Sequence, residues 1–244
     1  TMALNVSGTV GASWTTNATS LPVAINDQAV TAYGGKIQIV GPNTSAGALT
    51  TSSSAVVNAD GSVGTLTQGP ALLQNGSGRK AVIVNGWEYV FMPSSTAGAG
   101  YAPTMNYVQL CSTGTYCGIW QNGTVPVTEW RSAFEIATSS NAIYFVGGEN
   151  YSCVISATVH YAVVPPTGGA LSAWAATTSM PGTRYRGNSV AYNGYLYHLG
   201  WFVAFIAFVP HIAFVRRLTG ISWPALPDPV MYMALKTDAY LDAY

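Results

Sequence analysis

The chain has 244 residues, of which 49% are hydrophobic and only 7% charged, and nine basic and nine acidic residues cancel to a formal net charge of zero. Without a basic excess the chain lacks the field that holds a phosphate backbone, so we expect no nucleic-acid partner. A neutral surface this poor in charge favours association with other subunits or glycosylation.

Four short segments rich in β-branched and aromatic residues follow one another along the chain, each after a two-residue turn. The segments centre on Gln38, Tyr89, Tyr144 and Tyr197, which are 51, 55 and 53 residues apart. Glycine and asparagine supply the positive φ of a two-residue hairpin, so each segment is predicted to be the second strand of a hairpin. Third strands are expected at residues 54–61, 106–114, 157–164 and 211–215, and the hairpin turns are Gly34-Gly35, Asn85-Gly86, Ser140-Asn141 and Asn193-Gly194.

Tryptophan marks the same repeat. The landmark positions are Trp14, Leu66, Trp120, Trp174 and Trp223, with spacings of 52, 54, 54 and 49 residues. Four strands in about 50 residues, repeated, are typical of a β-propeller blade. We therefore predict an all-β propeller of four-stranded antiparallel blades, with the tryptophans buried between neighbouring blades. The alternative is a β-sandwich with fortuitous periodicity. The predicted units are residues 15–66, 67–120, 121–174 and 175–223.

The two ends resemble parts of one more unit, because residues 3–14 parallel residues 55–66. Residues 1–14 and 224–244 are accordingly assigned to a further blade. A blade split between the two ends would close a ring of five and hide its sheet edges. A longer natural chain would instead place these four units in a ring of six or seven.

The outer turn at residues 57–64, the segment Tyr144-Phe-Val-Gly-Gly148 and residues 188–200 resemble the kelch family in its bacterial form. The likeness covers nearly the whole chain, although the double glycine of kelch repeats occurs only at Gly147-Gly148. It implies a propeller but no particular reaction. Bacterial kelch proteins that act on sialic acid make a sugar ligand one expectation.

Cys111 and Cys117 are symmetric about Gly114, so a hairpin that turns there brings them within reach of a disulfide. Two free, half-buried thiols are the alternative, and Cys153 is expected to be unpaired and buried. A disulfide and six glycosylation sequons favour an exported, extracellular or cell-surface glycoprotein, although residues 1–15 lack the basic start of a signal peptide. The sequons begin at Asn5, Asn17, Asn43, Asn75, Asn122 and Asn150.

Four arginines precede the first strands of their units, at what is predicted to be one mouth of the central channel. A ring of guanidinium groups there could bind carboxylates or sugars. Alternatively, the arginines tie blades together through backbone carbonyls. They are Arg79, Arg131, Arg184 and Arg186. No catalytic residue, metal site or cofactor is predicted, and His160, His198 and His211 are interpreted as structural.

Residues 201–215 are apolar almost throughout and lack the alternation of the other strands. Trp201, Phe202, Phe205 and Phe208 are predicted to form an assembly contact with another subunit. A membrane helix is the weaker alternative, because the run is about fifteen residues, short of about twenty, and contains Pro210.

The sequence thus favours an exported, non-catalytic propeller that acts as a binding or assembly module of a cell-surface, appendage or particle complex. The alternative is a carbohydrate-binding or carbohydrate-active propeller that takes a sialic-acid-type ligand at an arginine-lined channel mouth.

Overall fold

The computed structural model describes residues 16, 21, 24–76, 78–93, 103–128, 131–204 and 207–215, and from residue 200 onward we describe the backbone only. Within this part of the chain every regular element is a β-strand. The strands form three four-stranded sheets, one three-stranded sheet and two short two-stranded ones. The predicted all-β propeller of antiparallel blades is confirmed.

The blades follow one another in sequence, and each is numbered by its order. Blade 1 has the strand order β1-β2-β5-β6, with bounds Ala29–Tyr33, Lys36–Val40, Ser52–Val56 and Thr67–Gln68. Blade 2 is β7-β8-β9-β10, with bounds Lys80–Val84, Trp87–Met92, Thr104–Gln109 and Gln121–Gly123. Blade 3 is β12-β13-β15-β16, with bounds Glu135–Ser139, Ala142–Val146, Val159–Val163 and Ala175–Ala176.

Blade 4 is described for three strands, β17-β18-β19, with bounds Tyr185–Tyr192, Tyr195–Ala204 and Ala207–Val215. The two short sheets lie in connecting segments. They pair β3 (Asn43–Thr44) with β4 (Gly47–Ala48), and β11 (Arg131–Ser132) with β14 (Glu149–Asn150).

The predicted hairpin turns are confirmed by their backbone. The first turn residues, Gly34, Asn85, Ser140 and Asn193, all have positive φ, between 50° and 57°. Glycine and asparagine adopt this conformation at the lowest cost, which explains why they dominate these positions.

A second repeated feature lies at the other end of the first strand of each blade, which we call the inner strand. Asp27, Gly78, Ala133 and Arg186 each have positive φ, of 52°, 65°, 50° and 50°. They are 51, 55 and 53 residues apart, the same spacings as in the hairpins. A left-handed kink therefore precedes or opens the inner strand of all four units, although only one of the four residues is a glycine.

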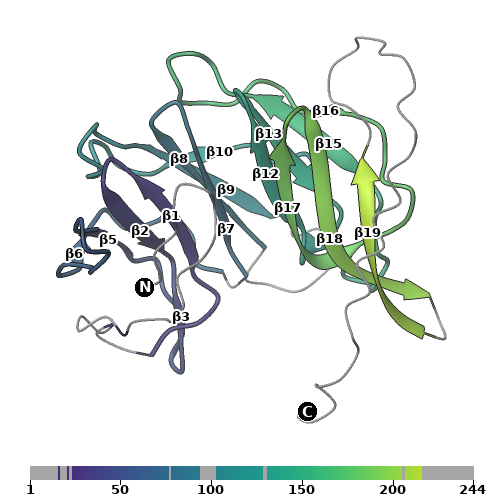
Figure 1. Ribbon diagram of the computed structural model, residues 1–244, viewed down its shortest axis with the longest axis horizontal. Helices are drawn as coiled ribbons and strands as arrows, with labels where there is room; N and C mark the ends of the chain where they lie inside the picture. The colour runs from purple at the N-terminus through teal and green to yellow at the C-terminus, as the bar shows by residue number, and fades with distance from the viewer. Residues whose placement is uncertain are drawn as a thin grey trace.

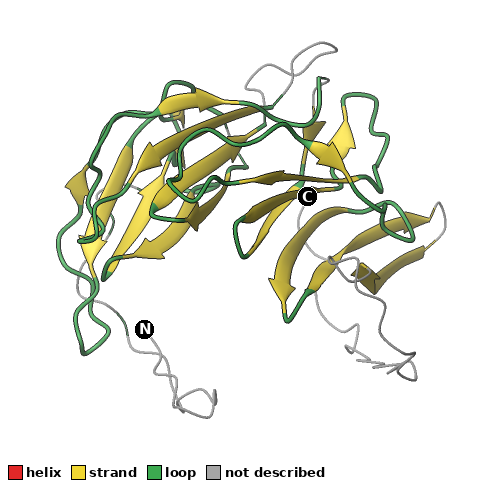
Figure 2. Ribbon diagram, turned by 90° about the horizontal axis from the view of Figure 1, so that it is seen from above, coloured by secondary structure: helices red, strands yellow, loops and turns green. Residues whose placement is uncertain are grey.

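The inner strands β1, β7, β12 and β17 lie beside one another in that order, and each contacts the next. Figure 1 shows the four sheets following one another from blade 1 to blade 4, and the view from above in Figure 2 shows them along a curve. The kinks and hairpin turns mark opposite ends of the inner strands. We call the end with the kinks the mouth.

The hydrophobic core lies between blades, where the face of one sheet packs on the next. Buried side chains join Val40 to Val90 and Trp120 between blades 1 and 2. Phe91 and Phe145 belong to the cluster between blades 2 and 3, and their ring centroids are 6.4 Å apart. Burial of such faces is the main stabilising contribution expected for stacked sheets.

The predicted equivalence of the tryptophan landmarks is confirmed for Trp120 and Trp174, but their predicted burial holds only for Trp120. The indole N–H of Trp120, just before β10, donates to the carbonyl of Pro70 at 3.0 Å. The indole N–H of Trp174, just before β16, donates to the carbonyl of Thr124 at 2.9 Å. Each partner is 50 residues earlier, on the preceding blade, so the two tryptophans are equivalent. Trp120 is buried and Trp174 half-buried, whereas Trp14 and Trp223 lie outside the described residues.

Cys111 and Cys117 form the predicted disulfide, with Cα atoms 5.3 Å apart, across the turn between β9 and β10. The prediction that Cys153 is buried is wrong, because its free thiol is exposed. Cys153 lies at the tip of a turn, where its backbone N–H donates to the carbonyl of Asn150 at 2.9 Å and its φ is 59°.

The apolar stretch 201–215 continues the β18 and β19 strands, which pair from Leu196↔Val215 to Ala204↔Ala207. The described residues contain no helix long and apolar enough to cross a membrane. Phe205 and the side chains of Trp201, Phe202 and Phe208 lie outside the described residues, so the assembly contact stays a prediction. The segments 1–14 and 224–244 also lie outside them, and their assignment to a further blade is likewise a prediction.

Candidate functional site at the channel mouth

The four predicted arginines all lie at the mouth, close to the start of an inner strand. Arg79 directly precedes β7, Arg131 lies in β11, Arg184 directly precedes β17, and Arg186 is within β17. The structure brings Arg131 and Arg184 to the same corner, because Arg131 donates to the carbonyl of Gly147 and Gly148 donates to the carbonyl of Arg184.

Arg79 ties blade 2 to blade 1. Its buried guanidinium donates to the backbone carbonyls of Gly41 and Leu49, the latter at 2.8 Å. Burial lowers the pKa of Arg79 to about 10, and the nearby carboxylate of Asp27 opposes that shift. An arginine held by two carbonyls in this way links blades, as the alternative interpretation of the arginines expects.

Arg131 and Arg184 are also buried and also contact backbone or hydroxyl oxygens. Nη1 of Arg131 lies 3.3 Å from the carbonyl oxygen of Gly147 and 3.4 Å from Oγ1 of Thr158. Nη1 of Arg184 donates to the carbonyl of Thr183 at 2.9 Å, and burial lowers the pKa of Arg184. Both side chains are therefore largely shielded from solvent.

Arg186 differs from the other three, because its side chain is exposed. It is the left-handed residue at a β-bulge, where the pairing of β17 with β18 shifts between Tyr185 and Gly187. Its backbone N–H donates to the carbonyl of Ala133 at 3.1 Å, which ties the bulge to blade 3. Its guanidinium carbon is 5.5 Å from the centre of the Tyr185 ring, within range of a cation–π contact. Bulges commonly redirect a side chain next to a binding site.

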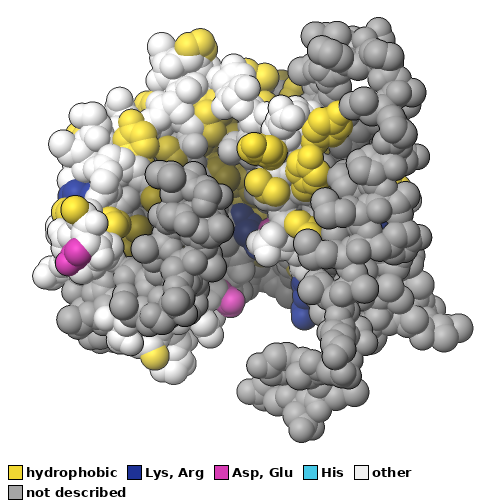
Figure 3. All heavy atoms as spheres, in the orientation of Figure 1, with side chains coloured by type: hydrophobic (Ala, Val, Ile, Leu, Met, Phe, Trp, Pro, Cys, Tyr) yellow, Lys and Arg dark blue, Asp and Glu magenta, His cyan; other side chains and the backbone are white. Residues whose placement is uncertain are grey.

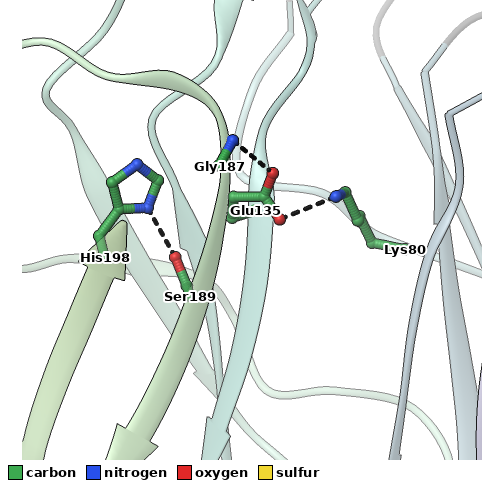
Figure 4. Close-up of polar contacts among 5 residues, drawn as sticks. All are labelled: Lys80, Glu135, Gly187, Ser189 and His198. Atoms are coloured by element: carbon green, nitrogen blue, oxygen red, sulfur yellow. Dashed lines mark hydrogen bonds and ion pairs between the residues drawn. The ribbon is translucent and has the colours of Figure 1, made fainter. Parts of the chain in front are cut away.

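A polar chain across three blades is the part of the mouth that sequence reasoning missed. Nζ of Lys80 on blade 2 lies 2.9 Å from Oε2 of Glu135 on blade 3, and Figure 4 shows the two side chains pointing toward each other. The other carboxylate oxygen of Glu135 accepts a hydrogen bond from the backbone of Gly187 on blade 4, at 3.1 Å. Burial raises the pKa of Glu135, and Lys80 opposes that shift. The signal was available, since both residues open an inner strand 55 positions apart.

His198 lies beside this polar chain, in the contact between blades 3 and 4. Its Nδ1 is 2.8 Å from Oγ of Ser189, and its imidazole is fully buried. Burial, followed by the charges of Arg184 and Lys80, lowers the pKa of His198 to about 4. The imidazole is therefore neutral at pH 7, as expected beside two cations.

The mouth carries charge of both signs, because Lys80 and Glu135 open neighbouring inner strands there. Figure 3 shows Lys or Arg side chains next to an Asp or Glu near the centre of the face that it draws, with hydrophobic side chains around them. Within the described ranges no three His, Cys, Asp or Glu side chains gather as metal ligands would. This arrangement offers cationic and hydrogen-bonding groups along the edge of the mouth, which we call the rim.

No protein-family model and no curated protein matches this chain. Among solved structures the chain is similar to the one described as "Structure of YjhT", with a TM-score of 0.53 and 13% sequence identity. The match covers 72% of this chain and 59% of that chain, so the present chain spans about three fifths of its length. At this identity the likeness shows the β-propeller fold.

Proposed function

We propose that the protein is a binding propeller that holds an anionic sugar of the sialic-acid type at the mouth, with Arg186 as the charged contact. The observation that carries the proposal is the contrast among the four arginines. Arg79, Arg131 and Arg184 are buried, and Arg79 links blade 2 to blade 1, whereas Arg186 is exposed. Of the four arginines considered from the sequence, Arg186 is thus the one that is presented to a ligand.

The chemistry around Arg186 suits a sugar acid. A guanidinium binds a carboxylate through two parallel hydrogen bonds, which a neutral sugar cannot replace. The Tyr185 ring lies beside the guanidinium, and the exposed amide of Asn188 is two residues further along β17. Amide groups of this kind bind sugar hydroxyls, so the rim supplies contacts for both parts of such a ligand.

The test is a titration of the full chain with N-acetylneuraminic acid and with its methyl ester, in which a methyl group on the carboxyl oxygen removes the negative charge. Isothermal calorimetry should detect the acid and show at least tenfold weaker binding of the ester. Arg186→Gln should weaken binding of the acid about tenfold, or about 1.4 kcal/mol. Lys36→Gln is the matched control, because it removes the same charge beside the hairpin turn at the opposite end of the strands.

Three results would overturn this proposal: no binding of the acid, equal binding of the ester, or equal effects of the two substitutions.

We further propose that the blades are kelch repeats and that the protein is exported. The double glycine supports the first point, because Gly147 and Gly148 have φ of 60° and 92°, and a Cβ on Gly147 would be 2.6 Å from the carbonyl oxygen of Arg184. The Cys111–Cys117 disulfide supports maturation in an oxidising compartment. Non-reducing alkylation of protein from its native source should then label Cys153 and leave Cys111 and Cys117 unmodified.

A further inference from the structure

The bulge that carries Arg186 turns two successive backbone N–H groups toward blade 3. In a regular strand, consecutive N–H groups point to opposite edges. Here the N–H of Arg186 donates to the carbonyl of Ala133 at 3.1 Å, and the N–H of Gly187 donates to Oε1 of Glu135, also at 3.1 Å. Blade 3 therefore holds the bulge at two consecutive residues, once through its backbone and once through a side chain.

The backbone conformation of Arg186 needs such support. Its φ is 50°, in the left-handed region that is unfavourable for a residue with a side chain. The pairing of β17 with β18 shifts between Tyr185 and Gly187, so the ladder leaves Arg186 out of register. Conformations of this kind persist only where the surrounding structure fixes them. The two hydrogen bonds to blade 3 supply that fixation from outside the sheet.

The side-chain acceptor is a special feature of blade 3. The residues equivalent to Glu135 in blades 1 and 2 are Ala29 and Lys80, with successive spacings of 51 and 55 residues. A methyl group and an ammonium group cannot accept a hydrogen bond. The carboxylate acceptor thus occurs in the blade that lies next to the exposed arginine.

Lys80 makes Glu135 a good acceptor. Glu135 is 3% exposed, and Figure 4 shows its carboxylate between the backbone of Gly187 and the ammonium group of Lys80. A buried carboxylate is costly unless it is paired, and the ion pair at 2.9 Å favours its charged form. Hydrogen bonds to a charged acceptor are stronger than those to a neutral one. The pair also compensates a negative charge that would otherwise repel an anion at Arg186.

We propose that Glu135 is a positioning residue of the mouth: its carboxylate holds the bulge in the conformation that presents Arg186, and so preorganises that guanidinium for an anionic ligand. Glu135 is buried and acts through the backbone of Gly187, without contact to the ligand. The statement about the ligand rests on the proposed function, whereas the statement about the bulge holds with or without a ligand.

Two double variants separate the hydrogen bond from the ion pair. Lys80→Met with Glu135→Met removes both contacts, and we call it the acceptor-free variant. Lys80→Met with Glu135→Gln removes only the ion pair, because a glutamine oxygen can still accept from Gly187. An apolar pair of similar volume commonly replaces a buried ion pair without loss of folding. The two variants thus differ in the acceptor for Gly187 and share the loss of the ion pair.

The first measurement needs no ligand. It compares amide proton exchange of Gly187 and Val164 in the full chain by ¹⁵N NMR spectroscopy. Val164 donates to the carbonyl of Asn141 at 2.7 Å, at the opposite end of blade 3, and reports any general loosening of the blade. Relative to Val164, Gly187 should exchange about tenfold faster in the acceptor-free variant than in the glutamine-containing one, because one hydrogen bond is lost.

Glu135→Asp provides a second test in a chain that keeps Lys80. Its carboxylate is shorter by one methylene, so it keeps the charge but draws the acceptor away from Gly187. Exchange of Gly187 relative to Val164 should again be faster than in the parent chain. Equal exchange ratios in the two double variants, or an unchanged ratio in Glu135→Asp, would overturn the proposal.

The second measurement is a calorimetric titration of the two double variants with N-acetylneuraminic acid. The acceptor-free variant should bind about fivefold more weakly, because part of the binding free energy is then needed to order the bulge. Equal affinities would overturn the preorganisation of Arg186. If the parent chain does not bind the acid, the proposed function fails, and the exchange ratios still decide whether Glu135 holds the bulge.

Discussion

Gln38 and Tyr89 occupy the same position in consecutive blades and make the same contact with the blade that follows. The amide of Gln38 donates to the carbonyl of Gly114 at 3.0 Å, and the hydroxyl of Tyr89 donates to the carbonyl of Gly169 at 2.8 Å. Both acceptors lie in turns of the next blade after its third strand. The repeat therefore preserves the link while the donor changes from an amide to a phenol.

The first prediction concerns the turn that carries Gly114, which the Cys111–Cys117 disulfide closes. Replacing both cysteines with serine should lower the free energy of unfolding by about 2 kcal/mol, the value expected for a loop this short. Urea unfolding at neutral pH measures it. Cys153→Ser is the control and should change nothing, because that thiol is free and exposed. Equal unfolding midpoints for the double variant and the control would contradict the prediction.

The second prediction is a pH dependence that arises from Glu88, a fully buried carboxyl between blades 1 and 2. Burial raises the pKa of Glu88 from 4.5 to about 7, although Thr31 donates a hydrogen bond to it at 2.6 Å. The folded state thus retains a proton that the unfolded state loses. The stabilisation that this retained proton gives the folded state is fully present below about pH 4.5 and is lost as the pH rises to about 7. The free energy of unfolding should fall by about 3 kcal/mol over this range.

Glu88→Gln tests this assignment, because an amide keeps an acceptor for Thr31 but does not titrate. Urea unfolding between pH 4.5 and 8 should show a smaller loss of stability in the variant than in the parent protein. Parallel curves for the two proteins would assign the pH dependence to other groups.

The third prediction concerns the Lys80–Glu135 ion pair. Lys80→Met should cost about 2 to 3 kcal/mol at pH 7, because it leaves the buried carboxylate of Glu135 without its cation. The cost should shrink at low pH, where that carboxyl becomes protonated. Adding Glu135→Gln to Lys80→Met should restore part of the loss in the same unfolding assay. A double variant less stable than Lys80→Met would mean that the carboxylate is not the source of the penalty.

The fourth prediction compares the two equivalent tryptophans. Trp120→Phe and Trp174→Phe remove the same indole hydrogen bond to the preceding blade, worth about 1 kcal/mol. Trp120 also fills a fully buried site, so Trp120→Phe should cost more, about 2 to 3 kcal/mol in total. Thermal unfolding of both variants measures the difference. The reverse order would contradict the prediction, because the less buried tryptophan would then contribute more to stability.

The sequence predicted the propeller because its signals are local. Asn85-Gly86 specifies a hairpin turn through backbone conformation alone, and the spacing of equivalent residues does not depend on which side chains fill the core. The pairing of Cys111 with Cys117 was predictable for the same reason, because both lie in one short turn.

The mouth was less predictable, because burial there depends on contacts between blades. Arg79 and Arg186 have the same residue type and both lie at the start of an inner strand, yet a loop of blade 1 covers the first and a bulge exposes the second. The Lys80–Glu135 contact joins side chains 55 residues apart in different blades. Charge alone could not indicate that pairing, although the equivalent positions of the two residues in the repeat could have.

The left-handed kinks at Asp27, Gly78, Ala133 and Arg186 have a consequence for how the rim can change during evolution. Four different side chains occupy one backbone conformation, so that conformation does not depend on any one residue type. At Arg186 a backbone hydrogen bond to the neighbouring blade contributes to holding it. Substitutions at these four places can therefore change the side chain at the mouth while the kink is kept. The fold separates a repeated backbone scaffold from a set of side chains that is free to diverge.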